Sequence, residues 1–360
     1  MNVGLTSEQL ALRDTVRGIL RTECPPDVPR IALDDLESDP RRWHPLWKTV
    51  VDLGWTELAA SDSDGEFGPV ELALVLEECG AALAPIPLLC SIGLAAGVLR
   101  AVVGQHCTDV LGEIASGAVA TLAVHSPGAR LPGTPMTLRD GRLRGRAVAV
   151  PHACHADMIV TLARSSDGPM AVVLRTGDGV TIRPGESTDP LHPFDDVDID
   201  AAPVAAAPIA TLDAALAAPL VAAAADLIGV ADAALQRSVE HAKTRRQFGA
   251  PIGAFQGVKH ALADNYVGLE RARSLTYAAA NRLDEMAAAA WTAAAMAKAA
   301  AADAAANCAR TAVQVFGALG QTWEHDAHLY VRHAWQGGAL LGDSRALYNE
   351  VGRRFAGGRA

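Results

Sequence analysis

The sequence predicts an α+β protein with an N-terminal helical domain, a middle antiparallel β domain and a C-terminal helical bundle. Apolar residues recur at helical spacing in the first and last parts of the chain. Short segments rich in β-branched residues, separated by Asp-Gly turns, lie between them. A chain of 360 residues is too long for one small core. Strands grouped between helices favour separate layers over alternating βαβ units.

The N-terminal domain is expected to span residues 1–115. Thr6 and Gln9 have the spacing of a capping box, which predicts a helix start at this point. Pro25 cannot continue that helix, so we expect the helix to end before it. Two further helical segments are expected in this domain, at 46–53 and 70–84.

The middle β domain is expected to span residues 116–210. Asp140-Gly141 stands between two short segments of β character, which is a strong signal for a β-hairpin. Asp167-Gly168 and Asp178-Gly179 mark two further turns. The segments expected to form strands are 120–124, 136–150, 158–162, 170–174 and 180–182.

The C-terminal domain, residues 211–360, is expected to form a bundle of the four-helix type. Its run from 287 to 306 is alanine-rich on nearly all sides, which predicts burial within the chain or between subunits. Asp343 is expected to cap a last helix over 344–355.

Composition excludes several classes of protein. The formal net charge of −10 argues against a general nucleic-acid surface, which needs clustered Lys and Arg. The six cysteines form no CxxC pair, and the first residues do not resemble a secretory signal. The run 286–297, taken as the most apolar stretch, is shorter than a membrane span. We therefore expect a cytoplasmic protein with reduced thiols and no membrane span.

Two C-terminal segments have residues suited to holding a phosphate group. The first, 245–256, is RRQFGAPIGAFQ, and the second, 314–332, begins QVFGALGQT and ends HLYVR. A guanidinium such as that of Arg245 can bind a pyrophosphate, and glycines let backbone N–H groups approach an anion. On spacing alone, the favoured interpretation is that Gly249 and Gly317 are the C-caps of helices.

Both segments closely resemble the C-terminal signature regions of acyl-CoA dehydrogenases. LWKTVVDLGWTELAA and LVLEECGAALAP resemble the first domain of that family. The segment DGRLRGRAVAVPHACHADMIVTLA looks like a degenerate form of the family's flavin-facing strands. The resemblance covers nearly the whole chain, strongly at the C-terminal end and weakly in the middle, and the domain order agrees.

In that family FAD lies across a subunit interface, so the resemblance implies residues that contact a neighbouring subunit's FAD. The usual second glycine of the family's FGG turn is Ala318 here. The residues implied to contact the pyrophosphate and adenosine side of that FAD are Arg245, Gln247, Phe248, Gln314, Gly317 and Gly320.

The catalytic base of the family has no counterpart at its two known positions. The family's reaction uses a carboxylate to remove the α-proton of an acyl-CoA thioester while FAD accepts the hydride. Counting nine residues past Arg332 of the HLYVR segment gives Leu341, and counting back from Arg245 to the alternative position gives Pro219. Neither side chain can accept a proton, so no catalytic residue is assigned.

The flavin-facing part of the β domain also departs from the family pattern. The TEP-like turn is His125-Ser126-Pro127, and the Trp-Ile-Thr stretch that lies against the flavin ring is Ala149-Val150-Pro151. Alanine cannot cover the ring, and proline offers no N–H. The carboxylates that could act as a relocated base are Asp226, Asp232, Glu240 and Asp343, although each also suits a solvated or capping helix position.

No metal site is expected from the sequence. His152, Cys154 and His155 lie close together, and His325 and His328 are three apart, but no third ligand with a recognisable spacing accompanies either group. Surface or turn histidines explain both groups.

The leading hypothesis is an accessory subunit of a heteromeric acyl-CoA dehydrogenase. Such α2β2 enzymes, some of which act on steroid side-chain CoA thioesters, combine one catalytic and one degenerate subunit type. The implied partners are a catalytic paralogue subunit, an acyl-CoA substrate and an electron-transfer flavoprotein as acceptor. Two alternatives stay open: a self-sufficient homomeric dehydrogenase with a relocated base, and an acyl-CoA-binding or scaffold protein without redox chemistry.

Overall fold

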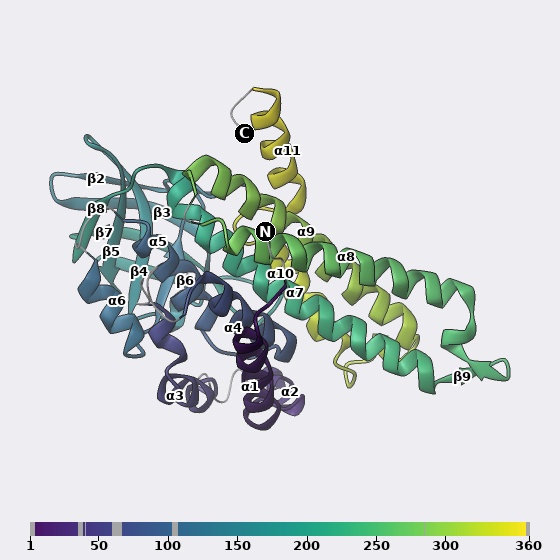
Figure 1. The fold of residues 1–360 in the computed structure, drawn as a ribbon. Helices are drawn as coiled ribbons and strands as arrows, with labels where there is room; N and C mark the ends of the chain where they lie inside the picture. Colours follow the sequence, from purple (N-terminus) through teal and green to yellow (C-terminus); the bar gives the residue numbers. More distant parts are fainter. Residues whose placement is uncertain are drawn as a thin grey trace.

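The computed structural model describes residues 4–34, 39, 41–59, 67–102, 107–283 and 285–357. Figure 1 shows a sheet at one end of the molecule, the first helices below it, and long helices that extend away from both. The order of helices, sheet and helices is therefore the order predicted from the sequence.

The N-terminal part is helical. Thr6 and Gln9 form the predicted capping box, in which Gln9 N–H donates to Thr6 Oγ1 over 3.2 Å and Thr6 N–H to Gln9 Oε1 over 3.0 Å. The first helix ends at Glu23, just before Pro25. The helices of this part are α1 (Ser7–Glu23), α2 (Asp27–Asp34), α3 (His44–Asp52), α4 (Pro69–Ala82), the π-helical segment Leu89–Ala95, α5 (Ala96–Arg100) and α6 (Thr108–Ala115).

The middle part is an eight-stranded sheet with the order β6-β7-β3-β2-β4-β5-β8, and β1 also pairs with β4. Most neighbours are antiparallel, but β1 and β2 both run parallel to β4, so the sheet is mixed rather than purely antiparallel. The strands are β1 (Ala120–Ala123), β2 (Met136–Arg139), β3 (Arg142–Pro151), β4 (Met158–Ser165), β5 (Gly168–Arg175), β6 (Val180–Pro184), β7 (Phe194–Ala201) and β8 (Ala205–Pro208).

The predicted hairpin at Asp140-Gly141 is confirmed. It joins β2 to β3, and both turn residues have positive φ, 52° and 72°, as a tight two-residue hairpin turn requires. The strands β7 and β8 were not predicted. β7 carries alternating aspartates (its residues 194–201 are FDDVDIDA), and β8 is mostly alanine, a poor strand former, so both depend on pairing with a neighbour.

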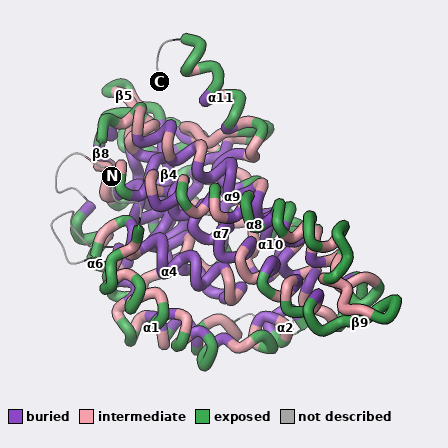
Figure 2. Tube along the Cα trace, turned by 45° about the vertical axis from the view of Figure 1, so that its right-hand side comes forward, coloured by how far each residue is buried: buried purple, intermediate pink, exposed green. Residues whose placement is uncertain are grey.

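The C-terminal part consists of long helices around α7 and α9. The alanine-rich α9 is buried within the chain, because α7, α8, α10 and α11 all pack against it. Figure 2 shows this buried centre and the exposed ends at α11 and β9. The elements are α7 (Leu212–Thr244), β9 (Arg246–Gln247), β10 (Ala250–Pro251), α8 (Gln256–Ala280), α9 (Ala287–Phe316), α10 (Ala327–Ala339) and α11 (Ser344–Ala356).

The helix α7 is the one described helix that is long and apolar enough to cross a membrane. The run 286–297 was expected to be the most apolar stretch, but the 18-residue segment of sufficient mean hydropathy lies in α7. Of this segment, 89% is buried inside the protein, as in a core helix.

Two glycines allow α4 and α7 to approach closely. A Cβ on Gly229 would lie 1.8 Å from the carbonyl oxygen of Glu77, and a Cβ on Gly80 would lie 2.1 Å from the carbonyl oxygen of Asp226. Since the obstructing atoms belong to the backbone, a side chain at either position would push the two helices apart.

We therefore expect Gly229→Ala to lower the free energy of unfolding by about 3 kcal/mol, because the added methyl separates α4 from α7. Urea unfolding followed by circular dichroism measures this change. Gly18→Ala is the matched control: Gly18 is exposed within α1 with no atom near its Cβ position. It should raise stability by up to about 1 kcal/mol through helix propensity. Equal effects of the two variants would contradict the close contact.

Candidate functional site

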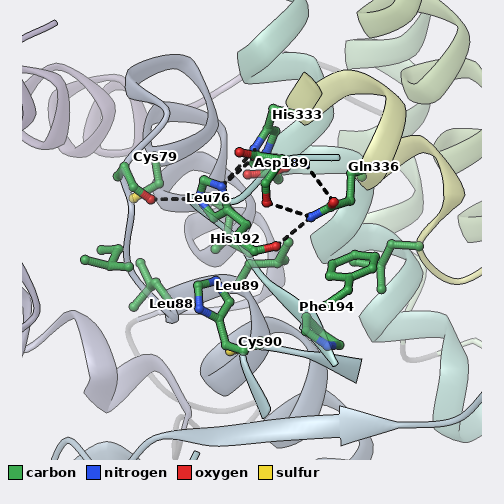
Figure 3. Close-up of a pocket in the computed structure, with 17 residues that line it drawn as sticks. Leu76, Cys79, Leu88, Leu89, Cys90, Asp189, His192, Phe194, His333 and Gln336 are labelled. Atoms are coloured by element: carbon green, nitrogen blue, oxygen red, sulfur yellow. Dashed lines mark hydrogen bonds and ion pairs between the residues drawn. The ribbon is translucent and has the colours of Figure 1, made fainter. Parts of the chain in front are cut away.

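A small cavity lies where α4, α7 and α10 meet the end of β3 and the loop between β6 and β7. Its volume is about 40 Å³, enough for a few water molecules but far below that of a pocket for an organic ligand. Apolar side chains such as Leu76, Leu88 and Leu89 line most of the wall (Figure 3). The polar residues in the wall are His152, Asp189, His192, Asp226, His333 and Gln336.

Asp189 is placed by a turn in the loop before β7. The Asp189-Pro190 pair is a turn signal, and Asp189 Oδ1 accepts from the Leu191 N–H over 3.2 Å. Gln336 of α10 fixes the same loop: its Oε1 accepts from the Asp189 N–H over 2.9 Å, and its Nε2 donates to the His192 carbonyl over 2.5 Å. The Asp189 side chain is thereby held 2% exposed.

Two histidine rings meet at the Asp189 carboxylate. Asp189 Oδ2 lies 2.8 Å from His192 Nδ1 and 2.7 Å from His333 Nδ1, and the two nitrogens are 3.1 Å apart. Burial alone would raise the pKa of Asp189, but His192 and His333 together hold that pKa well below its usual range. The cluster brings together residues 144 positions apart in the chain.

The far nitrogen of each ring also has a partner. His333 Nε2 lies 2.8 Å from Asp226 Oδ2 on α7, and His192 Nε2 lies 3.0 Å from the carbonyl oxygen of Ala84, which follows α4. Burial alone would lower the pKa of His333, but Asp226 and Asp189 raise it to about 10. The rings are therefore fixed at both nitrogens.

His152 adds a third imidazole beside the cluster. It directly follows β3 and lies in the left-handed region, with φ 51°, and its N–H donates to the Pro193 carbonyl over 2.7 Å. Its ring lies edge-on to His192 with centroids 5.6 Å apart, and its Nδ1 lies 3.2 Å from that of His155. Burial, with His192 next, lowers the pKa of His152 well below its ordinary value.

The two positions that correspond to the family's base are apolar and buried. Pro219 lies inside α7, and Leu341 is 1% exposed with a positive φ of 57°. The turn that carries Leu341 is held by the buried Lys298, whose Nζ donates to the carbonyls of Gly338 and Gly342 over 2.6 and 2.7 Å. Neither position has a group that could take a proton.

Of the four carboxylates considered as a relocated base, the structure places only Asp226 in the cavity wall. Asp232 is paired with Arg273 over 3.2 Å, and Glu240 lies exposed beside Lys243. Asp343 caps α11 by accepting from the Ala346 N–H over 2.9 Å, as predicted, and also pairs with Arg130. The last three therefore have structural or surface roles.

The first signature segment forms an exposed hairpin at the far end of the molecule, where β9 is labelled in Figure 1. Arg245, Gln247 and Phe248 are all exposed, and the Phe248 side chain is 93% exposed with φ 51°. Gly249, with φ 79°, lies in the turn of this hairpin rather than at a helix end.

The second signature segment ends α9. Gly317 is its C-cap, with φ 63°, and Gln314 is exposed one turn before it. Gly320 is buried, and a Cβ there would lie 2.9 Å from both the Phe316 Cβ and the Val313 carbonyl. The Phe316 ring contacts that of His241, with centroids 4.6 Å apart, which brings the end of α9 beside the end of α7.

The stretch that corresponds to the family's flavin-facing residues is a β-bulge. The register of β3 against β7 shifts between Ala147 and Val150, and Ala149 has a positive φ of 53°. Pro151 and His152, which follow the bulge, line the cavity. The bulge thus directs the end of β3 toward the Asp189 cluster.

The histidine groups considered from the sequence lie apart from the cluster, except His152. Cys154 is exposed, and its N–H donates to Asp195 Oδ2 over 2.8 Å. His325 accepts from the Ala327 N–H, and His328 stacks on Trp323. Sequence reasoning missed the residues Asp189, His192, His333 and Gln336, whose one local signal is the Asp-Pro turn.

Comparison with known families agrees with the architecture. The profile described as "Acyl-CoA dehydrogenase, N-terminal domain" matches residues 6–117, and "Acyl-CoA dehydrogenase, C-terminal domain" matches residues 214–355. The curated protein "Acyl-CoA dehydrogenase IpdE2" of Mycolicibacterium smegmatis is 30% identical over 95% of this chain and 96% of its own length.

A second relative, "Acyl-CoA dehydrogenase FadE34" of Mycobacterium tuberculosis, is 34% identical over 94% of this chain. The chain spans only 47% of the length of FadE34. Among solved structures, the ChsE4–ChsE5 complex from Mycobacterium tuberculosis matches with TM-score 0.86 and 28% identity over 99% of both chains. The Tcur3481–Tcur3483 steroid ACAD matches with TM-score 0.87 and 26% identity over 98% of both chains.

His125, in the turn after β1, gives a pH dependence that can be measured. Burial and the nearby Lys298 lower its pKa from 6.5 to about 4. The folded state therefore keeps His125 neutral while the unfolded chain gains a proton, so stability is lost as pH falls from about 6.5 to about 4. We expect that in His125→Phe the free energy of unfolding falls by about 3 kcal/mol less over this pH range than in the wild type. Urea unfolding at a series of pH values measures the difference. His260→Phe, at an exposed site on α8, should leave the slope unchanged.

Proposed function

The chain belongs to the acyl-CoA dehydrogenase family, a family of FAD-dependent oxidoreductases, and we propose that it acts there as an accessory subunit. In this proposal it lends FAD-binding residues to a catalytic partner that carries the base. The observation that carries the proposal is the pair of buried apolar residues, Pro219 and Leu341, at both base positions.

The exposed residues of the two signature segments suit a cofactor that is shared with a neighbouring chain. Arg245 and Gln247 offer charge and hydrogen bonds to a pyrophosphate, and the surface at Gly317 is unobstructed, with no atom near its Cβ position. Phe248, almost fully exposed, is an apolar surface that a partner or cofactor would cover. When bound, FAD would accept the hydride, and these residues would hold and orient its phosphate and adenosine part.

The cavity beside the Asp189 cluster is too small for an acyl chain. This cavity has a volume of only about 40 Å³. The ionisable side chains of its polar wall, Asp189, His333 and Asp226, are already paired with one another. An acyl chain needs several hundred Å³. A second pocket, of about 580 Å³, is lined by residues of α4, α5 and α7 and does not include the Asp189 cluster. Substrate turnover in the partner's site, with this chain completing the cofactor's surroundings, accommodates the small cavity at the cluster.

The relatives support a heteromeric enzyme. Two of the similar structures are assemblies of two differently named chains, and one of them is described as a steroid ACAD. We propose an α2β2 heterotetramer in the cytoplasm that introduces an α,β double bond into an acyl-CoA thioester, with a steroid side-chain CoA as the substrate class. An electron-transfer flavoprotein would accept the electrons.

The test is co-expression with a paralogue that carries the catalytic glutamate. The purified complex should contain FAD and oxidise acyl-CoA, and Arg245→Gln should lower its flavin content at least about tenfold, since a charge-assisted bond to the pyrophosphate is lost. Arg345→Gln, at an exposed position on α11, is the matched control and should leave flavin content unchanged.

The same experiment has outcomes that contradict the proposal. A chain that purifies alone with stoichiometric FAD and oxidises acyl-CoA is not an accessory subunit. Acyl-CoA binding without flavin, both alone and with the partner, would instead indicate a binding or scaffold protein.

A second candidate function rests on Asp226, the one carboxylate of the four that lines the cavity. If the chain is a self-sufficient dehydrogenase with a relocated base, Asp226→Asn should abolish turnover while FAD is retained. Asp232→Asn, Glu240→Gln and Asp343→Asn are controls, because these carboxylates lie outside the cavity wall. Turnover by the chain alone that survives Asp226→Asn would exclude this candidate.

A further inference from the structure

Three potential metal ligands converge beside the cavity. Asp189 Oδ2, His192 Nδ1 and His333 Nδ1 lie within 2.7–3.1 Å of one another. In the part of the chain that the structure describes, these three residues form the one group whose donor atoms are close enough to share an ion. All three come from rigid surroundings, the turn before β7 and the helix α10.

The outer contacts of the two rings fix which nitrogen faces the centre. A backbone carbonyl only accepts, so His192 Nε2, at 3.0 Å from the Ala84 oxygen, must carry a hydrogen. His333 Nε2 likewise donates to Asp226 Oδ2 over 2.8 Å. A neutral imidazole has one N–H, so each ring in its neutral form turns the Nδ1 lone pair inward, toward the other ring and the carboxylate.

A convergence of three lone pairs requires a positive charge at its centre. A single proton between the two Nδ1 atoms, which are 3.1 Å apart, can supply it. A divalent ion supplies it while both rings stay neutral. The arrangement in which a ligating His donates its other N–H to a carboxylate or backbone carbonyl is the usual surrounding of a metal-bound His. Both rings have it here, from Asp226 and Ala84.

We propose that Asp189, His192 and His333 bind a divalent transition-metal ion of the Zn²⁺ type, with water from the adjacent cavity as a further ligand. Two nitrogens and one carboxylate oxygen with an open position are a common ligand set for Zn²⁺. Bonds of about 2.0–2.1 Å in tetrahedral geometry place donors about 3.3 Å apart, so each donor moves outward by a few tenths of an ångström on binding.

The ion would connect four parts of the chain. Asp189 and His192 belong to the loop before β7, and His333 belongs to α10. Through Asp226 and Ala84, the site also reaches α7 and the end of α4. Occupancy is therefore expected to stabilise the fold, because the ion binds only when these elements are assembled.

The proposal is tested on the untagged full-length chain after treatment with a chelator. Titration with Zn²⁺, followed by calorimetry, should show one equivalent bound with a dissociation constant below about 1 µM. Co²⁺ in the same site should give the visible absorption of a four- or five-coordinate ion, and Zn²⁺ should raise the melting temperature. These measurements use neither flavin nor turnover, so their failure is distinct from failure of the accessory-subunit proposal.

Variants separate direct ligands from supporting residues. Asp189→Asn and His333→Gln should abolish binding, whereas Asp226→Asn, which only orients a ring, should weaken it about 10- to 100-fold. His328→Gln is the control, because this histidine stacks on Trp323 away from the cluster. Circular dichroism of each metal-free variant checks that it folds.

Two results would overturn the proposal. The first is a folded wild-type chain that takes up no Zn²⁺ or Co²⁺ at micromolar concentrations, which would identify the cluster as hydrogen-bonded through protons alone. The second is unchanged binding in folded Asp189→Asn and His333→Gln, which would place the ion elsewhere. The wild-type titration decides the first result without any variant, so misfolding of a variant cannot hide it.

Discussion

The contact between α4 and α7 sets the geometry on which the polar cluster depends. Gly80 of α4 lies directly against the backbone oxygen of Asp226, and Gly229, almost one turn later on α7, lies against the backbone oxygen of Glu77. This spacing leaves no room for side chains, so the two helices are held at a fixed separation and rotation. Asp226 then projects toward α10, where it pairs with His333, and His333 in turn meets Asp189. The position of one aspartate on a core helix thus decides where the loop before β7 can dock.

Ion pairing and packing reinforce one another in this region. A buried carboxylate is unfavourable unless its oxygens have partners; Asp189 Oδ1 accepts from a backbone N–H, and Oδ2 lies within 2.8 Å of Nδ1 of both rings. Gln336 accepts from the Asp189 N–H and donates to the His192 carbonyl of the same loop, so these two buried peptide groups are paired. The result is a compact polar core with a small cavity of about 40 Å³ beside it.

Much of the fold could be predicted from the sequence because its signals are local. The capping box at Thr6, the hairpin at Asp140-Gly141 and the cap at Asp343 each depend on residues within a few positions of one another, and all three were predicted. The parallel pairing of β1 and β2 with β4 could not be predicted, since a strand's own residues do not say which neighbour it takes. The cluster at Asp189 is non-local in the same way. His333 lies beside Arg332 within a recognised motif, yet nothing near it points to residues 144 positions earlier.

The exposed Phe248 has a consequence for how the protein must be made. Its ring, at the tip of the hairpin that carries Arg245 and Gln247, lies almost wholly in water, with Phe255 edge-on beside it at 6.1 Å. In a chain without a partner, an exposed aromatic tip of this kind can bind chaperones and other apolar surfaces. A cell that makes this chain in excess of whatever covers the tip would have to refold, store or degrade the surplus. In the proposed complex, the two chains would therefore have to be made in matched amounts, by shared transcription or by removal of unassembled copies.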